Sequence, residues 1–298
     1  AGKTTTMKIL TGFMPATRGN AVVAGYDVFD KPMEVKRRIG YMSQKFSLYS
    51  DLSVRENLDF YASIYGLNPA QTSQRKSAVL ELTSLTDRID QLAGTLSGGW
   101  KQRLALACAL IHEPEVVFLD EPTAGIDPVA RRQLWDLLFE LSSQGVTLLV
   151  TTHYMDEAER CTHMGYLYQA QLLVAGRPDE LKKLPAVSPS GTRRYELAAA
   201  EPARLLPLLK DEPGIHDATL FGQTIHLLVS DTVQPSELVD RLKRQQTITE
   251  CREIDPTLED VFVTLTRAAD QLNERALDAS SARPDEDPPP SQTQPTAP

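Results

Sequence analysis

The first five residues match part of a phosphate-binding motif. Ala1-Gly2-Lys3-Thr4-Thr5 agrees with the end of the loop pattern GxxxxGK[ST], which precedes a helix. In such a loop Gly2 lets the backbone approach the phosphates, Lys3 places a positive charge on the β and γ oxygens, and Thr4 offers a hydroxyl to Mg²⁺. Because five residues can match by chance, this motif needs support from the rest of the chain.

Two adjacent carboxylates follow an apolar run, Glu115-Val-Val-Phe-Leu-Asp120-Glu121. A buried strand that ends in Asp120 could hold Mg²⁺ through water, and Glu121 could polarise a water molecule that attacks a phosphoryl group. The same run could be an ordinary strand that enters a turn. Since it follows Lys3 and Thr4 in chain order, we interpret it as part of a phosphoryl-transfer site.

A serine and two glycines, Ser97-Gly98-Gly99, come just before the predicted helix at 101–111. Adjacent glycines at a helix start cost backbone entropy, so an ordinary helix would avoid them. They are useful where exposed amides and a hydroxyl must meet an anion. An ordinary turn and cap is the alternative, which the position between the two other motifs disfavours.

An ordered set of motifs resembles the ATP-binding cassette (ABC) ATPases. The set comprises AGKTT, Gln44, LSGGW, VVFLDEPTAGID and His153, and it covers about residues 1–184. The resemblance implies an α/β fold of the P-loop NTPase class, with a mostly parallel RecA-like sheet and a helical signature subdomain. It also implies that two such domains, in a homodimer or paired with a second ABC ATPase, enclose two ATP molecules head to tail.

The resemblance assigns a role to each matching residue. The residues expected to bind the cofactor ATP are Gly2, Lys3, Thr4, Thr5, Gln44, Ser97, Gly98, Gly99, Asp120, Asp127 and His153. Those expected on the Mg²⁺ side are Thr4, Gln44 and Asp120. Glu121 would be the general base, with Gln44 and His153 completing the catalytic group. Asp127 would couple the two sites of the dimer, or it could simply cap the helix that follows.

Two departures from the family pattern are visible. Trp100 stands where the family usually has Gln, which we expect to alter packing rather than function. The chain also begins inside the phosphate loop, so we expect an N-terminally truncated ATPase with severely reduced ATP affinity. An inactive or regulatory remnant of an ABC ATPase is the alternative that this start suggests.

Strand and helix patterns alternate in the first part of the chain, as a largely parallel sheet covered by helices requires. The predicted strands are 20–24, 39–43, 116–120 and 146–151. The predicted helices are 54–65, 71–85, 101–111 and 131–141. The block 53–94 reads as an almost wholly helical insert. These elements would position Gln44, Asp120 and His153 at strand ends.

A second domain is predicted at 192–270, after a Pro/Ser/Gly linker at 185–191. Its pattern is βαββαβ followed by a helix, which predicts a small α+β domain of ferredoxin-like topology. The segment 279–298 is rich in Pro, Ser and Gln and is predicted to be disordered.

The ending Ile254-Asp-Pro-Thr-Leu-Glu-Asp-Val-Phe262 resembles multidrug exporters of the ABC-2 class, which pair an ATPase subunit with a separate permease. The resemblance implies that the permease docks on the helical insert. Candidate docking residues are Phe46, Tyr49, Phe60, Tyr61 and Tyr65, although aromatic residues at helical spacing more often belong to the core. A non-transport ABC ATPase acting on nucleic acid or ribosomes is disfavoured, because the interval from Gln44 to Leu96 lacks a long coiled coil.

Bulk properties agree with this interpretation. The formal net charge of −9 argues against non-specific nucleic-acid binding, and the three cysteines include no CxxC pair. The apolar runs fall short of the ~18–20 residues that cross a bilayer. We therefore expect a cytoplasmic protein, attached peripherally to the inner face of the membrane through its permease.

Overall fold

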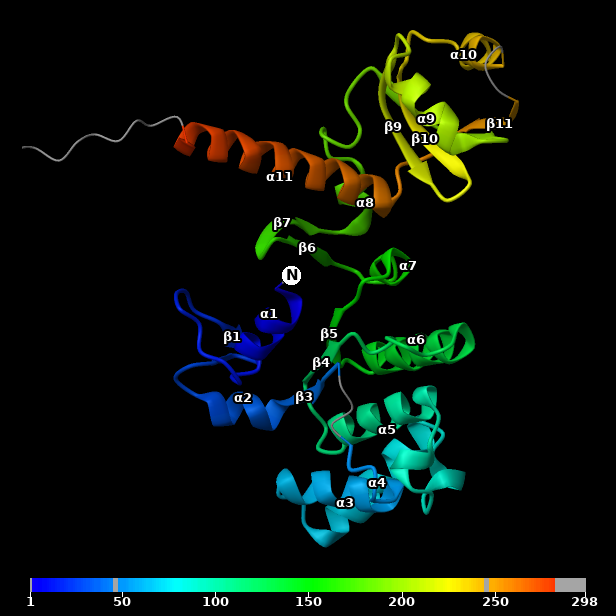
Figure 1. Ribbon diagram of the computed structural model, residues 1–298. Coiled ribbons are helices and arrows are strands. Elements are labelled where there is room, and N and C mark those ends of the chain that lie inside the picture. The colour runs from blue at the N-terminus through cyan, green and yellow to red at the C-terminus, as the bar shows by residue number, and fades with distance from the viewer. Residues whose placement is uncertain (1, 45–47, 244–246, 282–298) are drawn as a thin grey trace, which may run out of the picture. The chain divides into compact units, whose positions relative to one another are not determined.

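A computed structural model describes residues 2–44, 48–243 and 247–281, which divide into two units (Figure 1). The first unit contains the residues up to Arg160 together with Gln169–Gln171. The second contains Cys161–Tyr168 and the residues from Leu172 onward. Within the described ranges, no helix is long and apolar enough to cross a membrane.

Three parallel strands form the central sheet of the first unit. They are β3 (Ile39–Met42), β4 (Val116–Asp120) and β5 (Thr147–Thr151), and β4 lies in the middle. The central strand is apolar and almost fully buried, as a strand paired on both edges and covered on both faces should be. The predicted parallel sheet is confirmed for these strands.

Helices cover both faces of this sheet and connect its strands. Figure 1 shows α1 (Lys3–Leu10) on one side of the strands and α6 (Pro128–Ser143) on the other. Helix α5 (Gly98–Leu110) packs against β3, and α6 packs against β5. The chain then continues from β5 into the short helix α7 (Met155–Ala158). The carboxyl ends of β3, β4 and β5 therefore share one edge of the sheet.

A small antiparallel hairpin and one helix complete the α1 side of the first unit. The hairpin pairs β1 (Val22–Val23) with β2 (Tyr26–Asp27), and α2 (Pro32–Arg38) follows it. Strand β1 is shorter than the strand predicted at 20–24, since only two residues pair before the turn. The buried side chains of this region include Met7, Val35 and Phe118.

The predicted helical insert is confirmed. It consists of α3 (Val54–Ile64), α4 (Pro69–Leu82) and the 3₁₀ turns η1 (Thr86–Arg88) and η2 (Ala93–Thr95), and it packs on α5 (Figure 1). Ser53 and Glu56 form a capping box at the start of α3, as Asn68 and Gln71 do for α4. Val54, Leu58 and Ala62 of α3 recur every four residues and are fully buried, which fixes the face that α3 turns inward.

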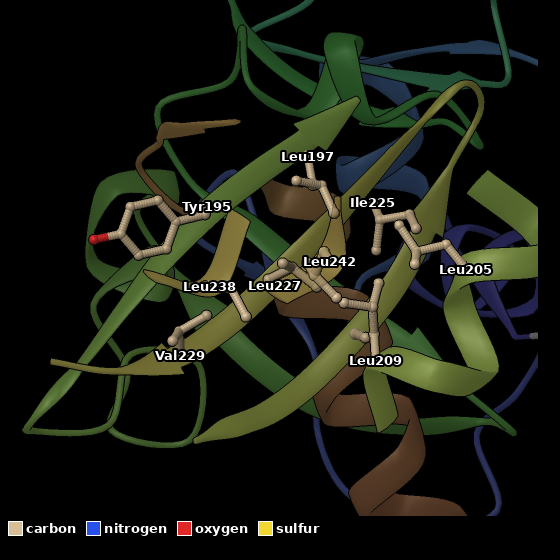
Figure 2. Packing of buried hydrophobic residues seen from close by; sticks show 10 residues of the cluster. Tyr195, Leu197, Leu205, Leu209, Ile225, Leu227, Val229, Leu238 and Leu242 are labelled. Atoms are coloured by element: carbon tan, nitrogen blue, oxygen red, sulfur yellow. The ribbon is translucent and has the colours of Figure 1, made fainter. Parts of the chain in front are cut away.

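The second unit contains a four-stranded antiparallel sheet. Its elements are β8 (Thr192–Ala199), α9 (Pro202–Lys210), β9 (Ile215–Phe221), β10 (Thr224–Ser230), α10 (Pro235–Leu242), β11 (Ile248–Glu253) and α11 (Leu258–Ser281). The spatial order β11-β8-β10-β9 confirms the predicted βαββαβ topology. Figure 2 shows its core, where Leu205 and Leu209 of α9 face Ile225 and Leu227 of β10.

The residues 161–184 were assigned to the first domain from sequence, but they pack mainly in the second unit. They form β6 (Met164–Tyr168), β7 (Gln171–Gly176) and α8 (Pro178–Lys182). The Tyr166 hydroxyl lies 2.8 Å from that of Thr266, and the Tyr168 hydroxyl donates to Asp270 at 2.9 Å, which ties the hairpin to α11. The predicted domain boundaries, including the linker 185–191, stay a prediction.

The predicted disordered tail at 279–298 overlaps the end of α11, which continues to Ser281. The remainder of the tail lies outside the described residues. The candidate docking residue Phe46 and the first residue of the phosphate motif, Ala1, also lie outside them.

Candidate active site

Asp120 ends the central strand and is almost fully buried. Its register partner is Thr151, the last residue of β5, whose hydroxyl donates to Asp120 Oδ1 at 2.7 Å. The Thr4 hydroxyl donates to the same oxygen at 3.3 Å. Among the described residues, nothing hydrogen-bonds to Oδ2 of Asp120. The sheet edge thus presents one carboxylate oxygen that is buried and unsatisfied, which a bound group would have to complete.

Glu121 is the next residue and has a left-handed backbone conformation, with φ of 54°. Its amide donates to the carbonyl and hydroxyl oxygens of Thr151, at 3.1 and 3.0 Å. Gln44 Nε2 donates to Glu121 Oε2 at 2.8 Å, and His153 Nε2 contacts Glu121 Oε1. The carboxylate is therefore held from two sides by side chains that follow β3 and β5.

Lys3 lies beside the same carboxylates. Its Nζ donates to the carbonyl oxygen of Thr152 at 2.8 Å, contacts His153 Nδ1 at 2.9 Å, and lies 4.0 Å from Glu121 Oε1. Burial lowers the pKa of Lys3, although the negative charges of Glu121 and Asp120 oppose this shift. A lysine that loses hydration in this way would gain strongly from a phosphate brought close to it.

The N-terminus of α1 completes this group. Gly2 precedes α1 with φ of 106°, a conformation that glycine adopts without strain, and its carbonyl accepts the amide of Thr6 at 2.9 Å. The helix therefore starts immediately at Lys3, with Thr4 turned to Asp120. Thr5 is exposed, and none of the described contacts joins it to this group.

The glycine motif lies at a different place in the first unit. Ser97 and Gly98 are exposed at the start of α5, and the described contacts do not join them to the Lys3 group. A Cβ on Gly99 would lie 2.8 Å from Cβ of Ala130, so a larger residue would push α5 away from α6. Close helix packing is thus a second reason for this glycine, beside the predicted contact with an anion.

Asp127 caps α6. Its Oδ1 accepts the amides of Val129 and Ala130 at 3.0 and 2.9 Å. The predicted alternative role of Asp127 as a helix cap is therefore confirmed, whereas the coupling role across a dimer stays a prediction.

Comparison with known proteins identifies both parts of the chain. Residues 1–124 match the family model described as "ABC transporter", and residues 176–266 match "ATP-binding protein DrrA1-3-like, C-terminal domain". The Nod factor export ATP-binding protein I of Burkholderia lata is 35% identical over 269 residues, which are 89% of this chain and 84% of that protein. The chain belongs to the family of ABC transporter ATP-binding proteins.

Other ABC proteins match a shorter part of the chain. The probable multidrug ABC transporter ATP-binding protein YbhF of Escherichia coli is 44% identical over 182 residues, 61% of this chain and 32% of that protein. The linearmycin resistance ATP-binding protein LnrL of Bacillus subtilis is 37% identical over 61% of this chain and 58% of its own length. This chain therefore spans less than two thirds of these two relatives. The predicted resemblance to exporter ATPases is confirmed.

Solved structures agree on the fold. The ATP binding subunit of an ABC transporter matches 61% of this chain and 76% of its own, with a TM-score of 0.55 and 31% identity. The protein cbiO1 of Clostridium perfringens matches 63% of this chain and 80% of its own, with a TM-score of 0.55 and 26% identity. The predicted P-loop NTPase fold is thus confirmed.

Three residues that contact or support the candidate site have no recognisable signal in the sequence. Thr151 and Thr152 look like ordinary β-branched strand residues, yet one orients Asp120 and the amide of Glu121 while the other accepts from Lys3. Glu157 looks like a surface acid of a polar helix but is fully buried. The parallel register between β4 and β5 could have suggested Thr151, because it lies directly opposite Asp120.

The candidate site offers part of a ligand set for a divalent cation. Among the described residues, no cluster of three His, Cys, Asp or Glu side chains could hold a metal ion. The Asp120 carboxylate and the Thr4 hydroxyl could supply two oxygens, and Oδ2 of Asp120 is unsatisfied. One or two protein oxygens are what Mg²⁺ uses when phosphates and water provide its other ligands. Gln44, the third predicted metal residue, instead contacts Glu121.

Proposed function

We propose that this protein is the ATP-binding and ATP-hydrolysing subunit of an ABC-2-type export system and powers a separate membrane permease through ATP-driven dimerisation. The observation that carries the proposal is the convergence of Lys3, Gln44 and His153 on the carboxylate of Glu121. The names of the relatives, which refer to multidrug transport, linearmycin resistance and Nod factor export, support export as the process.

The proposed reaction begins when ATP phosphates approach the start of α1. Lys3 would transfer its hydrogen bonds from Thr152 and His153 to phosphate oxygens, which have a stronger charge. Glu121 would then accept a proton from the attacking water, since Gln44 and His153 hold the carboxylate in place. Asp120 and Thr4 would hold Mg²⁺, whose charge stabilises the phosphate oxygens.

The proposed partners follow from surfaces that the first unit leaves exposed. Ser97 and Gly98 at the start of α5 would meet the nucleotide of a second ABC subunit. Tyr49, which precedes the helical insert, and Phe60 of α3 are 48% and 37% exposed, and their rings pack edge to face at 4.6 Å. They are candidates for contact with the permease, which would place the protein at the cytoplasmic face of the membrane.

The substitution Glu121→Gln tests the proposed hydrolysis. It keeps the size of the side chain but removes the base, so phosphate release should fall by about a thousandfold. ATP binding should persist, and the variant should accumulate as an ATP-bound dimer in size-exclusion chromatography. Glu140→Gln, at an exposed position of α6, is the matched control and should behave as the parent protein. Parental turnover in Glu121→Gln would exclude Glu121 as the base.

A second substitution tests the dimer separately. Ser97→Arg places a long cation where the second subunit should close, so it should abolish the ATP-dependent dimer while leaving nucleotide binding to the monomer measurable. If the parent protein binds ATP but neither dimerises nor releases phosphate, a regulatory role replaces the catalytic one. Co-purification of the membrane partner would test the link to a permease.

A further inference from the structure

Glu157 of α7 is a fully buried carboxylate that contacts the loop carrying His153. Its Oε2 accepts the hydroxyl of Thr152 at 2.5 Å, and this hydroxyl oxygen accepts the amide of Tyr154 at 3.0 Å. The carbonyl of Thr152 accepts Lys3 Nζ at 2.8 Å on the other side of the backbone. Thr152 therefore contacts both Glu157 and Lys3, and it directly precedes His153 in the chain.

A cation from another element faces the same carboxylate. Arg131 of α6 has its Nε 3.9 Å from Glu157 Oε1, and its guanidinium lies 4.4 Å from the ring centre of Tyr154. Arg131 is one turn after Asp127, and its amide donates to the Asp127 carbonyl at 2.9 Å. The first turn of α6 thus reaches the residues on both sides of His153. Arg131 contacts Tyr154 directly, and it faces Glu157, which accepts the hydroxyl of Thr152.

A buried carboxylate depends strongly on its surroundings, because water does not screen it. If α6 moves relative to β5, the distance between Arg131 and Glu157 changes, and the Thr152 hydroxyl must adjust. A movement of Asp127 would reach the His153 loop by the same contacts. Such a transmission of movement requires only residues that already lie next to one another in the structure.

We infer that Glu157 is a positioning residue that couples the Asp127 end of α6 to the loop holding His153 and Lys3. The inference rests on the proposed function and adds to it a connection within one subunit. A second subunit that closes on Asp127 would shift Arg131, and Glu157 would convert this shift into the alignment of His153 with Glu121. None of the described contacts joins Glu157 itself to Glu121 or to the Lys3 ammonium.

A double-substitution cycle tests the coupling. Arg131→Gln and Glu157→Gln should each lower kcat roughly tenfold while the KM for ATP stays within about twofold, because phosphate binding by Lys3 remains. The combined variant should lose no more than either single one. Arg131→Lys keeps the positive charge and should recover most of the turnover. Losses that multiply would show that the two residues act independently and would overturn the inference.

Hydrogen exchange in the nucleotide-free protein gives a readout that does not depend on activity. Glu157→Ala removes the acceptor of the Thr152 hydroxyl, so the Tyr154 amide should exchange roughly tenfold faster. Arg131→Gln should accelerate the same amide by a smaller factor, although the substitution is on another helix. An unchanged Tyr154 amide in Arg131→Gln would show that α6 does not influence the loop.

The matched control is Arg132→Gln, because Arg132 is exposed next to Arg131 and none of the described contacts joins it to Glu157. It should leave kcat, KM and Tyr154 exchange unchanged, and an effect equal to that of Arg131→Gln would overturn the inference. The two proposals fail in different ways. If Glu121→Gln abolishes hydrolysis but Arg131→Gln has full turnover, only the coupling is wrong. If Glu121→Gln retains turnover, the proposed function is wrong.

Discussion

Among the described residues, each unit has one almost fully buried aspartate, and the two differ in the hydrogen bonds that their carboxylate oxygens accept. Asp260 in the second unit has partners on both oxygens: Arg194 and His226 on Oδ1, and the amide and hydroxyl of Thr257 on Oδ2. Asp120 in the first unit has described partners on Oδ1, and in the described part of the chain no group hydrogen-bonds to its Oδ2. A buried carboxylate that the chain itself satisfies supports a fold, whereas one left half-satisfied is suited to a ligand.

The lowered pKa of Asp260 agrees with a structural role for its ionised carboxylate. Burial alone would raise its pKa, but hydrogen bonds from His226 and Thr257 and the charge of Arg194 together hold the pKa below its usual value. Asp260 lies in the segment 254–262, which resembles the ending of ABC-2-type exporter ATPases. The physical role of this segment is to place Asp260 of α11 against Arg194 and His226 of the sheet.

The largest effect in the comparison should follow from Asp120→Asn. The amide keeps an oxygen for Thr4 and Thr151 but removes the charge that a metal-bound phosphate needs, so ATP hydrolysis should fall by about a thousandfold, or roughly 4 kcal/mol. Phosphate release measures this loss, and chemical denaturation should show no loss of stability. If this variant instead unfolds easily, Asp120 is a structural residue like Asp260.

Asp260→Asn should give the reverse result. It leaves Arg194 buried without its carboxylate, so the free energy of unfolding of the second unit should fall by about 3 kcal/mol. Both tryptophans, Trp100 and Trp135, lie in the first unit, so circular dichroism would detect this loss while tryptophan fluorescence of the first unit should not.

The same substitution should also change how the stability of the second unit depends on pH. Because the folded pKa of Asp260 lies below its usual 3.8, its stabilisation is complete above that value and is lost as the pH falls through the lowered pKa. Asp260→Asn should therefore reduce the acid sensitivity of the second unit below about pH 4. An unchanged acid transition would contradict the assignment.

A smaller effect concerns His112, a partly buried imidazole whose lowered pKa favours its neutral form. Its ring stacks on Tyr65 at 3.5 Å, and burial lowers its pKa to about 4, with the charge of Arg75 adding to the shift. The unfolded chain binds a proton below its usual value of 6.5, so stability should fall by about 2 kcal/mol between pH 7 and pH 5. Tryptophan fluorescence during urea unfolding measures this, and His112→Phe should remove it, unlike His163→Gln at an exposed site.

The smallest effect is expected at Trp100, the residue that departs from the family pattern. Its ring centre lies 4.4 Å from the guanidinium of Arg88 and 5.2 Å from that of Arg103, so it joins η1 to α5. Trp100→Gln should lower the stability of the first unit by about 1 kcal/mol and change ATP turnover by only a few-fold. A loss of turnover as large as that of Glu121→Gln would assign Trp100 a direct part in the reaction.

Much of the fold follows from the sequence, because its patterns are local. The run that ends at Asp120 is apolar without interruption and becomes the central strand, and the alternation after residue 192 becomes a βαββαβ unit. Helix α6 begins at Pro128, three residues before the predicted start, because Asp127 caps it and proline suits the first turn. The packing of β6 and β7 in the second unit escaped prediction, since it depends on contacts with the distant Thr266 and Asp270.

The candidate site shows the same division between local and distant information. Motif residues such as Lys3, Asp120 and Glu121 are recognisable because the chemistry restricts their types. The contacts of Glu157 cannot be read from its polar neighbours in the sequence, because they involve Arg131 of another helix and Thr152 of the folded loop. Residues that hold a site in place thus carry weaker sequence signals than residues that act in it.

The left-handed backbone of Glu121 has a further consequence for the evolution of this protein. A residue with a Cβ is disfavoured at a φ of 54° by roughly 1 kcal/mol, and glycine or asparagine would relieve this strain. Selection for heat resistance alone would therefore favour variants that replace the proposed base. Thermal stability and ATP turnover therefore favour different residues at position 121. A thermostable variant selected without a screen for ATP hydrolysis should be sequenced first at this position.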